Sequence, residues 1–191
     1  MSAGDTWMRP VRLPGTSRTL LTSLRMEERM PVRELARRAG VADAPELVRL
    51  RWIMFGSPGA APAPRWAADC TAAFAQRLDD PLFAIFVVDT GRGGLAACAA
   101  GTCTPRLPRP GNSAPYAGHI GSVATDSAHR RRVYCRACVT AARDRLAGQG
   151  CTVIDLYASA DGRPLYDTMG FVVRQPDVAM IWRAPSASRE W

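Results

Sequence analysis

Two apolar runs separated by a glycine-rich turn constrain the fold of this chain more than any other feature. Residues 83–89 read FAIFVVD, residues 95–103 read LAACAAGTC, and the turn TGRGG joins them. β-branched and small apolar residues on both sides of a Gly-rich connection predict an antiparallel hairpin. Because neither run alternates between apolar and polar residues, we expect both strands to be buried inside a sheet that other elements cover.

Helix and strand patterns alternate around this hairpin. Helical spacing of apolar residues predicts helices over residues 43–55, with Asp43 as the N-cap, over 66–78 and over 132–149, and a short helix over 161–169. Apolar or β-branched runs predict strands at 32–38, 116–125, 151–158, 171–174 and 178–183. This order predicts an α/β fold with a mixed sheet.

The length of 191 residues suits a single folded domain with a core large enough to need no crosslinks. Residues 1–30 show little periodicity and are predicted to form an N-terminal arm or disordered tail. We assign residues 31–184 to the folded domain and 185–191 to a C-terminal tail. The six cysteines lie in apolar segments and are expected to be reduced, buried thiols.

Stretches without charge are broken by Pro, Gly and polar residues before they reach the length of a membrane span, so no membrane partner is expected. The N-terminal residues lack the apolar segment of a secretion signal. A cytoplasmic location is therefore the expectation.

Three arginines stand where the helix over residues 132–149 begins. The chain has a net charge of +8, and all of its basic residues are arginines, which is typical of a GC-rich coding sequence. Arg130, Arg131 and Arg132, however, precede a helix N-terminus, where positive charge is unfavourable unless an anion binds. The arrangement suits a phosphate or pyrophosphate, and a solvated cluster due to codon bias is the alternative.

These residues resemble a known family. The stretch SVATDSAHRRRVYCRACVTAARDRL (122–146) resembles the acyl-CoA-binding motif of the GNAT N-acyltransferases. The stretch DLYASADGRPLYDTMGF (155–171) resembles the family's second motif, with Leu165, Tyr166, Gly170 and Phe171 in place. Residues 41–55 resemble the first helix of the family, so the resemblance covers about residues 32–183.

The resemblance implies a mixed, mostly antiparallel sheet of about seven strands with about four helices. It also implies an N-acyltransferase whose donor is acetyl-CoA or another acyl-CoA and which needs no metal. In such an enzyme an amine attacks the thioester directly in a ternary complex. Two family glycine positions are occupied by Arg131 and Val133, so the phosphate cradle is bulkier than usual. The donor-binding residues implied by the resemblance are Val123, Ala124, Thr125, Arg130, Arg131, Arg132, Val133, Tyr134, Cys135, Arg136 and Ser159.

The resemblance assigns Tyr166 as the general acid that protonates the leaving thiolate, and the alternative is a core aromatic. His119 lies on a strand expected to face the substrate, and histidine changes protonation near neutral pH, which suits a general base. A histidine without a catalytic role is an equally good interpretation. Cys135 and Cys138 form a CxxC, but no second cysteine or histidine pair supports a metal site.

The acceptor is expected to be a small-molecule amine, because the segments 56–64 and 104–116 contain few charges. A role in specialised metabolism or drug self-resistance is an analogy with the family. An acyl carrier protein as donor, a homodimer and a catalytically inactive binding protein remain alternatives. Residues 33–50 also resemble a DNA-binding helix-turn-helix, but Pro45 stands early in the would-be recognition helix and makes nucleic acid an unfavoured partner.

Overall fold

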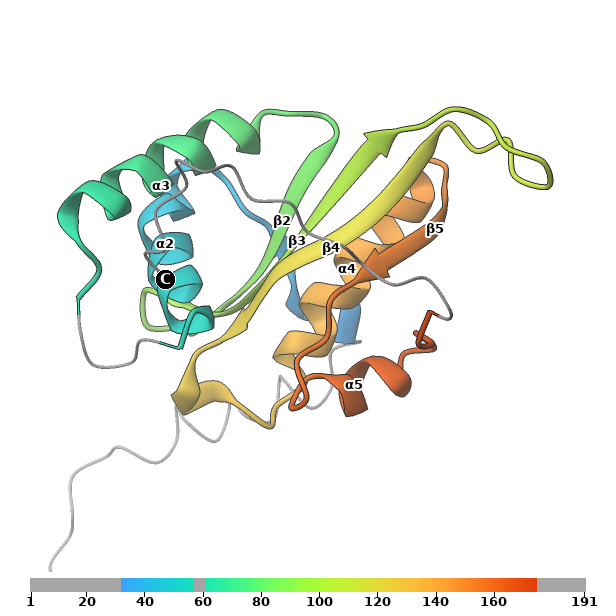
Figure 1. Cartoon of the computed structure of the whole chain (residues 1–191). Coiled ribbons are helices and arrows are strands. Elements are labelled where there is room, and N and C mark those ends of the chain that lie inside the picture. Colours follow the sequence, from blue (N-terminus) through green and yellow to red (C-terminus); the bar gives the residue numbers. More distant parts are fainter. Residues whose placement is uncertain (1–31, 57–60, 175–191) are drawn as a thin grey trace, which may run out of the picture. The chain divides into compact units, whose positions relative to one another are not determined.

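Five strands form one sheet in the computed structural model, which describes residues 32–56 and 61–174 (Figure 1). The strands are β1 (Arg37–Arg38), β2 (Phe83–Asp89), β3 (Leu95–Pro105), β4 (Tyr116–Thr125) and β5 (Cys151–Leu156). They lie in the order β1-β2-β3-β4-β5. Neighbouring strands are antiparallel except β4 and β5, which are parallel. The predicted hairpin is confirmed as β2 and β3, with Val87 opposite Cys98.

Helices cover both faces of the sheet. The helices α2 (Ala44–Met54) and α3 (Pro64–Leu78) lie on one face, and α4 (Tyr134–Gly148) lies on the other (Figure 1). Alternate residues of β2, namely Phe83, Ile85 and Val87, join the buried cluster beneath α2 and α3. This cluster also takes in Leu47 and Leu50 of α2. The absence of polar alternation in β2 therefore reflects burial of both of its faces, as expected.

Two glycines allow α4 to approach the sheet closely. A Cβ placed on Gly101 of β3 would lie 3.3 Å from Cγ of Leu146, a fully buried α4 residue. A Cβ placed on Gly118 of β4 would lie 3.2 Å from Cδ1 of the same leucine and 2.9 Å from Cγ1 of Ile154. Any side chain at Gly118 would therefore push α4 or β5 away from β4.

The chain forms two compact units, of which the first ends at Leu156 and the second begins at Tyr157. The second unit contains α5 (Arg163–Asp167), which begins after Gly162 and is shorter than the predicted helix over residues 161–169. Tyr166 of α5 is buried, and its ring packs edge-on against Phe171 with 6.0 Å between ring centroids. The assignment of residues 31–184 to a single domain stays a prediction.

Some predicted elements differ from the structure. Residues 32–38 form the 3₁₀-helix η1 (Val32–Leu35) and only then the short strand β1. Residues 171–174 were expected to be a strand, but the Phe171 N–H donates to the Tyr166 carbonyl at 3.1 Å and closes the turn after α5 instead. The described residues thus contain five strands, and the strand predicted at 178–183 and both predicted tails lie outside them.

Asp43 is the N-cap residue of α2, as predicted, but its side chain forms no hydrogen bond with the first turn of the helix. Its carboxylate accepts hydrogen bonds from the Gly40 N–H and the Arg37 guanidinium, each at 2.8 Å, and so closes the 3₁₀-turn η2 (Val41–Asp43) that precedes the helix. No helix within the described ranges has the length and apolar character required to cross a membrane.

Candidate functional site

The segment between β4 and α4 is held in place by Asp126. One carboxylate oxygen accepts the Ala128 N–H at 3.0 Å and caps the 3₁₀-helix η3 (Ser127–His129), and the other accepts Nη1 of Arg49 at 2.5 Å. Although partial burial raises the pKa of Asp126, the hydrogen bonds from Ala128 and Arg49 bring it below its usual value. Asp126 therefore stays ionised and ties this segment to α2.

Arg131 adopts a left-handed backbone conformation in this segment. Its φ angle is 59°, a region that glycine enters freely and other residues enter at a cost. Its neighbour Arg130 is extended, with φ −66° and ψ 161°. The position at which sequence comparison expects a glycine thus retains the backbone geometry that a glycine would supply.

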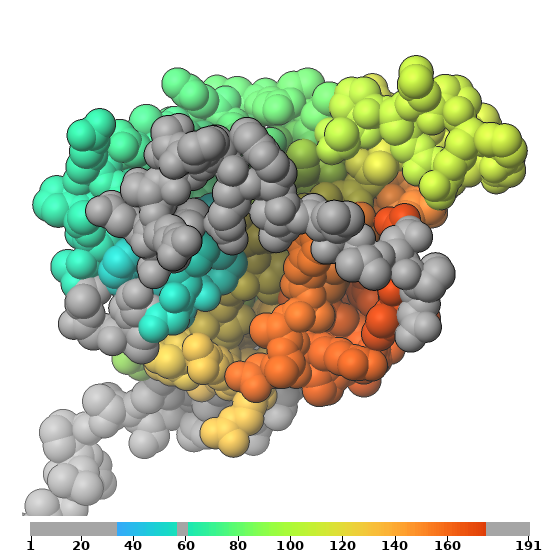
Figure 2. Space-filling model, in the orientation of Figure 1, coloured from blue at the N-terminus to red at the C-terminus, as the bar shows by residue number. Residues whose placement is uncertain are grey.

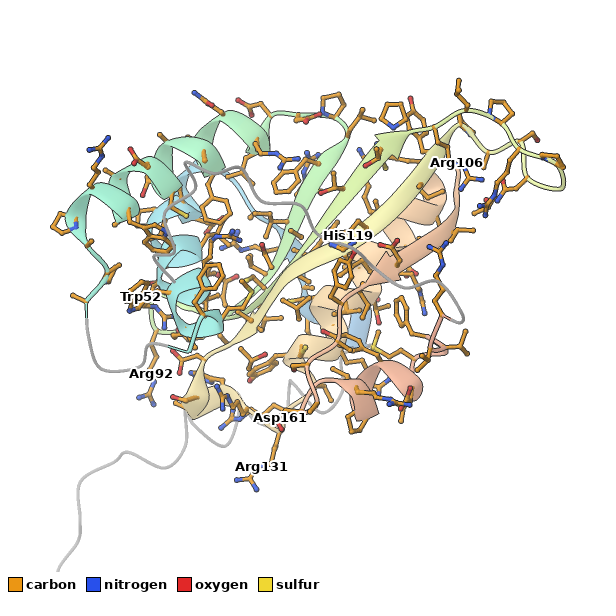
Figure 3. All side chains as sticks on the ribbon, in the orientation of Figure 1. Trp52, Arg92, Arg106, His119, Arg131 and Asp161 are labelled. Atoms are coloured by element: carbon orange, nitrogen blue, oxygen red, sulfur yellow. The ribbon has the colours of Figure 1, made fainter. Side chains whose placement is uncertain are left out.

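Three exposed arginines surround the N-terminus of α4. Arg130, Arg131 and Arg132 are all exposed, and Arg131 points away from the loop in Figure 3. Val133 stands at the N-cap position and provides no side-chain hydrogen bond to the helix. The first N–H groups of a helix have no intrahelical partner and carry partial positive charge. The exposed arginines and the free N–H groups of the first turn give this segment the positive charge and the donors that suit a phosphate or pyrophosphate.

Tyr134 anchors the first turn of α4. Its side chain is buried, its ring lies 6.1 Å from that of His129, and its hydroxyl lies 3.4 Å from Nη1 of Arg132. The phenol therefore lies in the packing beneath the loop. Thr125, at the end of β4, contacts the Cys135 thiol, and Arg136 is half-buried one position further along α4.

A β-bulge interrupts β4 just before this loop. The pairing of β3 with β4 shifts between Cys98 and Ala100, and Ser122 has a φ angle of 48°. Arg51 of α2 donates from Nη1 to the Ser122 hydroxyl at 2.7 Å, and the Cys98 thiol contacts the Ser122 carbonyl at 3.3 Å. Beyond the bulge Val123 is half-buried and Ala124 lies in the core beneath α2. Such bulges change the direction of a strand and occur often beside active sites.

His119 of β4 forms a short contact with Asp155 of β5. The two residues are register partners in the parallel pair of strands, and 2.6 Å separates His119 Nδ1 from Asp155 Oδ1. The two side chains are 39% and 60% exposed, so the pair lies at the surface of the sheet and not in the core. Figure 3 shows His119 at the middle of the sheet.

The other predicted site residues lie in the second unit, which is described by itself. The Ser159 hydroxyl accepts the Gly162 N–H at 3.2 Å and forms the turn that precedes α5. A Cβ on Gly162 would lie 3.2 Å from both this hydroxyl and the Tyr166 ring. Tyr166 is thus buried in the local packing of α5, and its proposed role as an acid remains a prediction.

The CxxC at the start of α4 has the properties of buried thiols. Burial raises the pKa of Cys135, although the contact with Thr125 opposes the shift, and burial raises the pKa of Cys138 far more. Redox-active CxxC thiols have lowered pKa values instead. No group of three or more potential metal ligands gathers among the residues that the structure describes.

Residues 33–50 do not form a helix-turn-helix. Where the first helix of that motif would stand, the chain forms η1 and then pairs with β2 through Arg37 and Arg38. Pro45 lies in the first turn of α2, whose buried residues pack on the sheet. The alternative of a DNA-binding helix pair is therefore not supported by the structure.

Sequence reasoning missed Asp155, Arg49 and the bulge at Ser122. Asp155 is the only acidic residue in CTVIDLYA, and a charge inside a buried-strand pattern is the feature that could have identified it. No comparable feature marks Arg49 or Ser122 in the sequence. Arg49 acts through Asp126, which is 77 positions away, and Ser122 is bound by Arg51, which is 71 positions away.

Comparison with known proteins agrees with this geometry. The model of the acetyltransferase (GNAT) family matches residues 45–171. A predicted acetyltransferase from Clostridium acetobutylicum, determined with acetyl-CoA, is similar at 21% identity and a TM-score of 0.65, over 76% of this chain and 94% of that one. A GCN5-related N-acetyltransferase from Ralstonia eutropha is similar at 24% identity and a TM-score of 0.61, over 76% and 97%.

Glucosamine-6-phosphate N-acetyltransferase from Arabidopsis thaliana is similar at 18% identity and a TM-score of 0.62, over 78% of this chain and 97% of that one. The TM-scores show that this chain shares its fold with these three proteins. A search of the curated proteins gave no match.

Proposed function

Because the chain belongs to the GNAT acetyltransferase family, we propose that it moves an acetyl or other short acyl group from acetyl-CoA to the amine of a small molecule. The observation that carries this proposal is the left-handed backbone of Arg131, directly before the N-terminus of α4. A loop of this geometry lets backbone N–H groups face a pyrophosphate even where glycine has been replaced.

The described residues fit the donor. Arg130, Arg131 and Arg132 supply positive charge, and the first turn of α4 supplies N–H groups. A guanidinium binds phosphate oxygens through two parallel hydrogen bonds, which is stronger than a neutral contact. We infer that Arg131 replaces the close approach of a glycine with a charge-assisted contact. Val133 is 43% exposed, so its side chain points into solvent and not into the helix packing.

Acetyl-CoA supplies a thioester whose carbonyl carbon the amine attacks, so that a C–N bond forms and the C–S bond breaks. We propose that His119 accepts the proton that the amine loses. Tyr166 is the proposed general acid, which donates its phenolic proton to the leaving thiolate. His119 then releases its proton to solvent and Tyr166 takes one up, so the net reaction converts an amine and a thioester into an amide and a free thiol, with no covalent intermediate on the protein. Positioning of the two reactants supplies most of the rate enhancement.

The segment between β3 and β4 carries little charge. The segment 104–116 lies at the upper right of Figure 2, and within it Arg106 and Arg109 are the only charged residues. We propose a small, weakly charged amine as acceptor, and specialised metabolism as the setting.

The first test measures thermal stability in the presence of donor. At a hundredfold excess over its dissociation constant, acetyl-CoA should stabilise the fold by about 2.7 kcal/mol, or roughly 5–10 °C for a chain of this size. Arg131→Ala should reduce that shift. Arg65→Ala, at an exposed arginine on α3, should leave it unchanged. No shift with any acyl-CoA would contradict the proposed donor site.

The second test measures transfer. A panel of amines with mass-spectrometric detection should reveal an N-acyl product, and Tyr166→Phe should lower its rate by about 10²-fold or more while leaving the thermal shift with acetyl-CoA intact. Transfer only from a loaded acyl carrier protein would replace the donor with that protein. A thermal shift without transfer to any amine would favour a binding protein that has lost catalysis.

A further inference from the structure

His119 and Asp155 are held opposite each other by the backbone of two strands. They are register partners in the parallel pair of β4 and β5, so their separation of 2.6 Å does not depend on the chance meeting of two long side chains. Both Cα positions are fixed by the sheet, and each short side chain has few rotamers. The pair is therefore pre-organised.

The position of the pair indicates a functional role over a structural one. His119 is 39% exposed and Asp155 is 60% exposed, and exposed ion pairs contribute little to folding stability. His119 lies on β4, the strand that leads to the bulge at Ser122 and to the proposed donor loop, and Asp155 lies beside it on β5.

The hydrogen-bonding chemistry determines which nitrogen of His119 carries a proton. An ionised carboxylate only accepts hydrogen bonds, so Nδ1 must be the donor in this contact. In a neutral imidazole the lone pair then resides on Nε2. A Cβ placed on Gly121 would lie 3.2 Å from that nitrogen. Any side chain at Gly121 would therefore crowd this edge of the imidazole.

We propose that Asp155 is a positioning residue for catalysis: it accepts the Nδ1 proton of His119 and thereby presents Nε2 as the nitrogen that takes the proton of the acceptor amine. This inference rests on the proposed acyl transfer. Asp155 gains no proton itself. It fixes the orientation and the tautomer of the imidazole, and it stabilises the imidazolium that forms when Nε2 is protonated.

The decisive variant is Asp155→Asn. Loss of the carboxylate should lower kcat about 10- to 100-fold, because a misoriented base loses part of the 10²- to 10⁴-fold that general-base catalysis contributes. The KM for acetyl-CoA should not change. Asp155→Glu should restore part of kcat. Asp144→Asn removes an exposed carboxylate on α4 that pairs with its neighbour Arg143, and it should leave kcat unchanged.

A double-mutant cycle separates action through His119 from any other effect of Asp155. If Asp155 acts only by positioning the imidazole, Asp155→Asn should have no further effect on kcat in a His119→Gln background. Additive losses would overturn the proposal, as would an unchanged kcat in Asp155→Asn alone.

A spectroscopic measurement tests the pairing without relying on activity. The chain contains two histidines, so ¹⁵N NMR of the imidazoles gives two sets of signals, and His119→Gln assigns them. Neutral His119 should carry its proton on Nδ1 in the native protein and should lose this preference in Asp155→Asn. A proton on Nε2 in the native protein would overturn the proposal. If no acyl transfer occurs but the tautomer is as expected, the proposed function fails while the pairing stands.

Discussion

Arg131 has a left-handed backbone conformation that is usually found at glycine. An L-residue in the left-handed region costs about 1–2 kcal/mol, and glycine avoids this cost but loses about 0.5–1 kcal/mol more backbone entropy on folding. Since Arg131 has a φ angle of 59°, Arg131→Gly should raise the free energy of unfolding by up to about 1 kcal/mol. Urea denaturation measures this change.

The neighbouring residue is the matched control. Arg130 has a φ angle of −66°, so Arg130→Gly relieves no strain and should lower the free energy of unfolding. If Arg131→Gly proves no more stable than Arg130→Gly, the left-handed conformation carries no cost. The sequence could predict the arginine cluster and the missing glycines here. It could not predict the retained backbone, because a φ angle depends on how the loop is held between β4 and α4.

At the scale of elements, Arg49 connects α2 to two other parts of the first unit. Its guanidinium binds Glu46 at 2.9 Å and the Leu95 carbonyl at 2.7 Å in addition to Asp126. Hydrogen bonds from Arg49 lower the pKa of Glu46 below its usual 4.5, although partial burial opposes the shift. The Glu46 carboxylate also accepts the Leu95 N–H at 2.9 Å.

This network should make stability fall with acid. A carboxyl whose pKa is lower in the folded state stabilises the fold above its unfolded pKa, and this contribution is lost as pH falls through the folded value. Stability due to Glu46 should therefore be complete above about pH 5 and decline below it. In Glu46→Gln, the free energy of unfolding should therefore depend less on pH between about pH 5 and pH 3. Because the Glu46 side chain is partly exposed, the difference should be less than about 1 kcal/mol. An unchanged slope would contradict this role.

Elements whose pattern lies within a short stretch of sequence could be predicted, and those that depend on distant partners could not. The hairpin of β2 and β3 has its full pattern within 23 residues of sequence, and α4 has regularly spaced apolar residues followed by Gly148 and Gly150, so local residues determine both. Residues 32–38 were predicted as one strand, but only Arg37 and Arg38 find partners on β2. The contact of His119 with Asp155 spans 36 positions and depends on the register of parallel strands, which no local pattern specifies.

At the scale of the whole molecule, the cysteines report on the integrity of the core. Burial raises the pKa values of Cys98 and Cys151 to about 12 and that of Cys138 well above its usual value. Since the thiolate is the reactive form, these three thiols should react slowly with iodoacetamide at pH 8 in the native protein and rapidly in guanidinium chloride. Cys70 is only half-buried and should react earlier. Mass spectrometry of timed samples measures each rate, and labelling of Cys98 ahead of Cys70 would show that the core opens.

The left-handed backbone at Arg131 also has a consequence for how this loop can evolve. Every arginine codon is a single base change from a glycine codon, and the backbone at this position already suits both residues. A lineage can therefore exchange a guanidinium for a glycine, or reverse the exchange, without rebuilding the loop. Charge and close approach at the start of α4 are then alternatives that selection can test one mutation at a time.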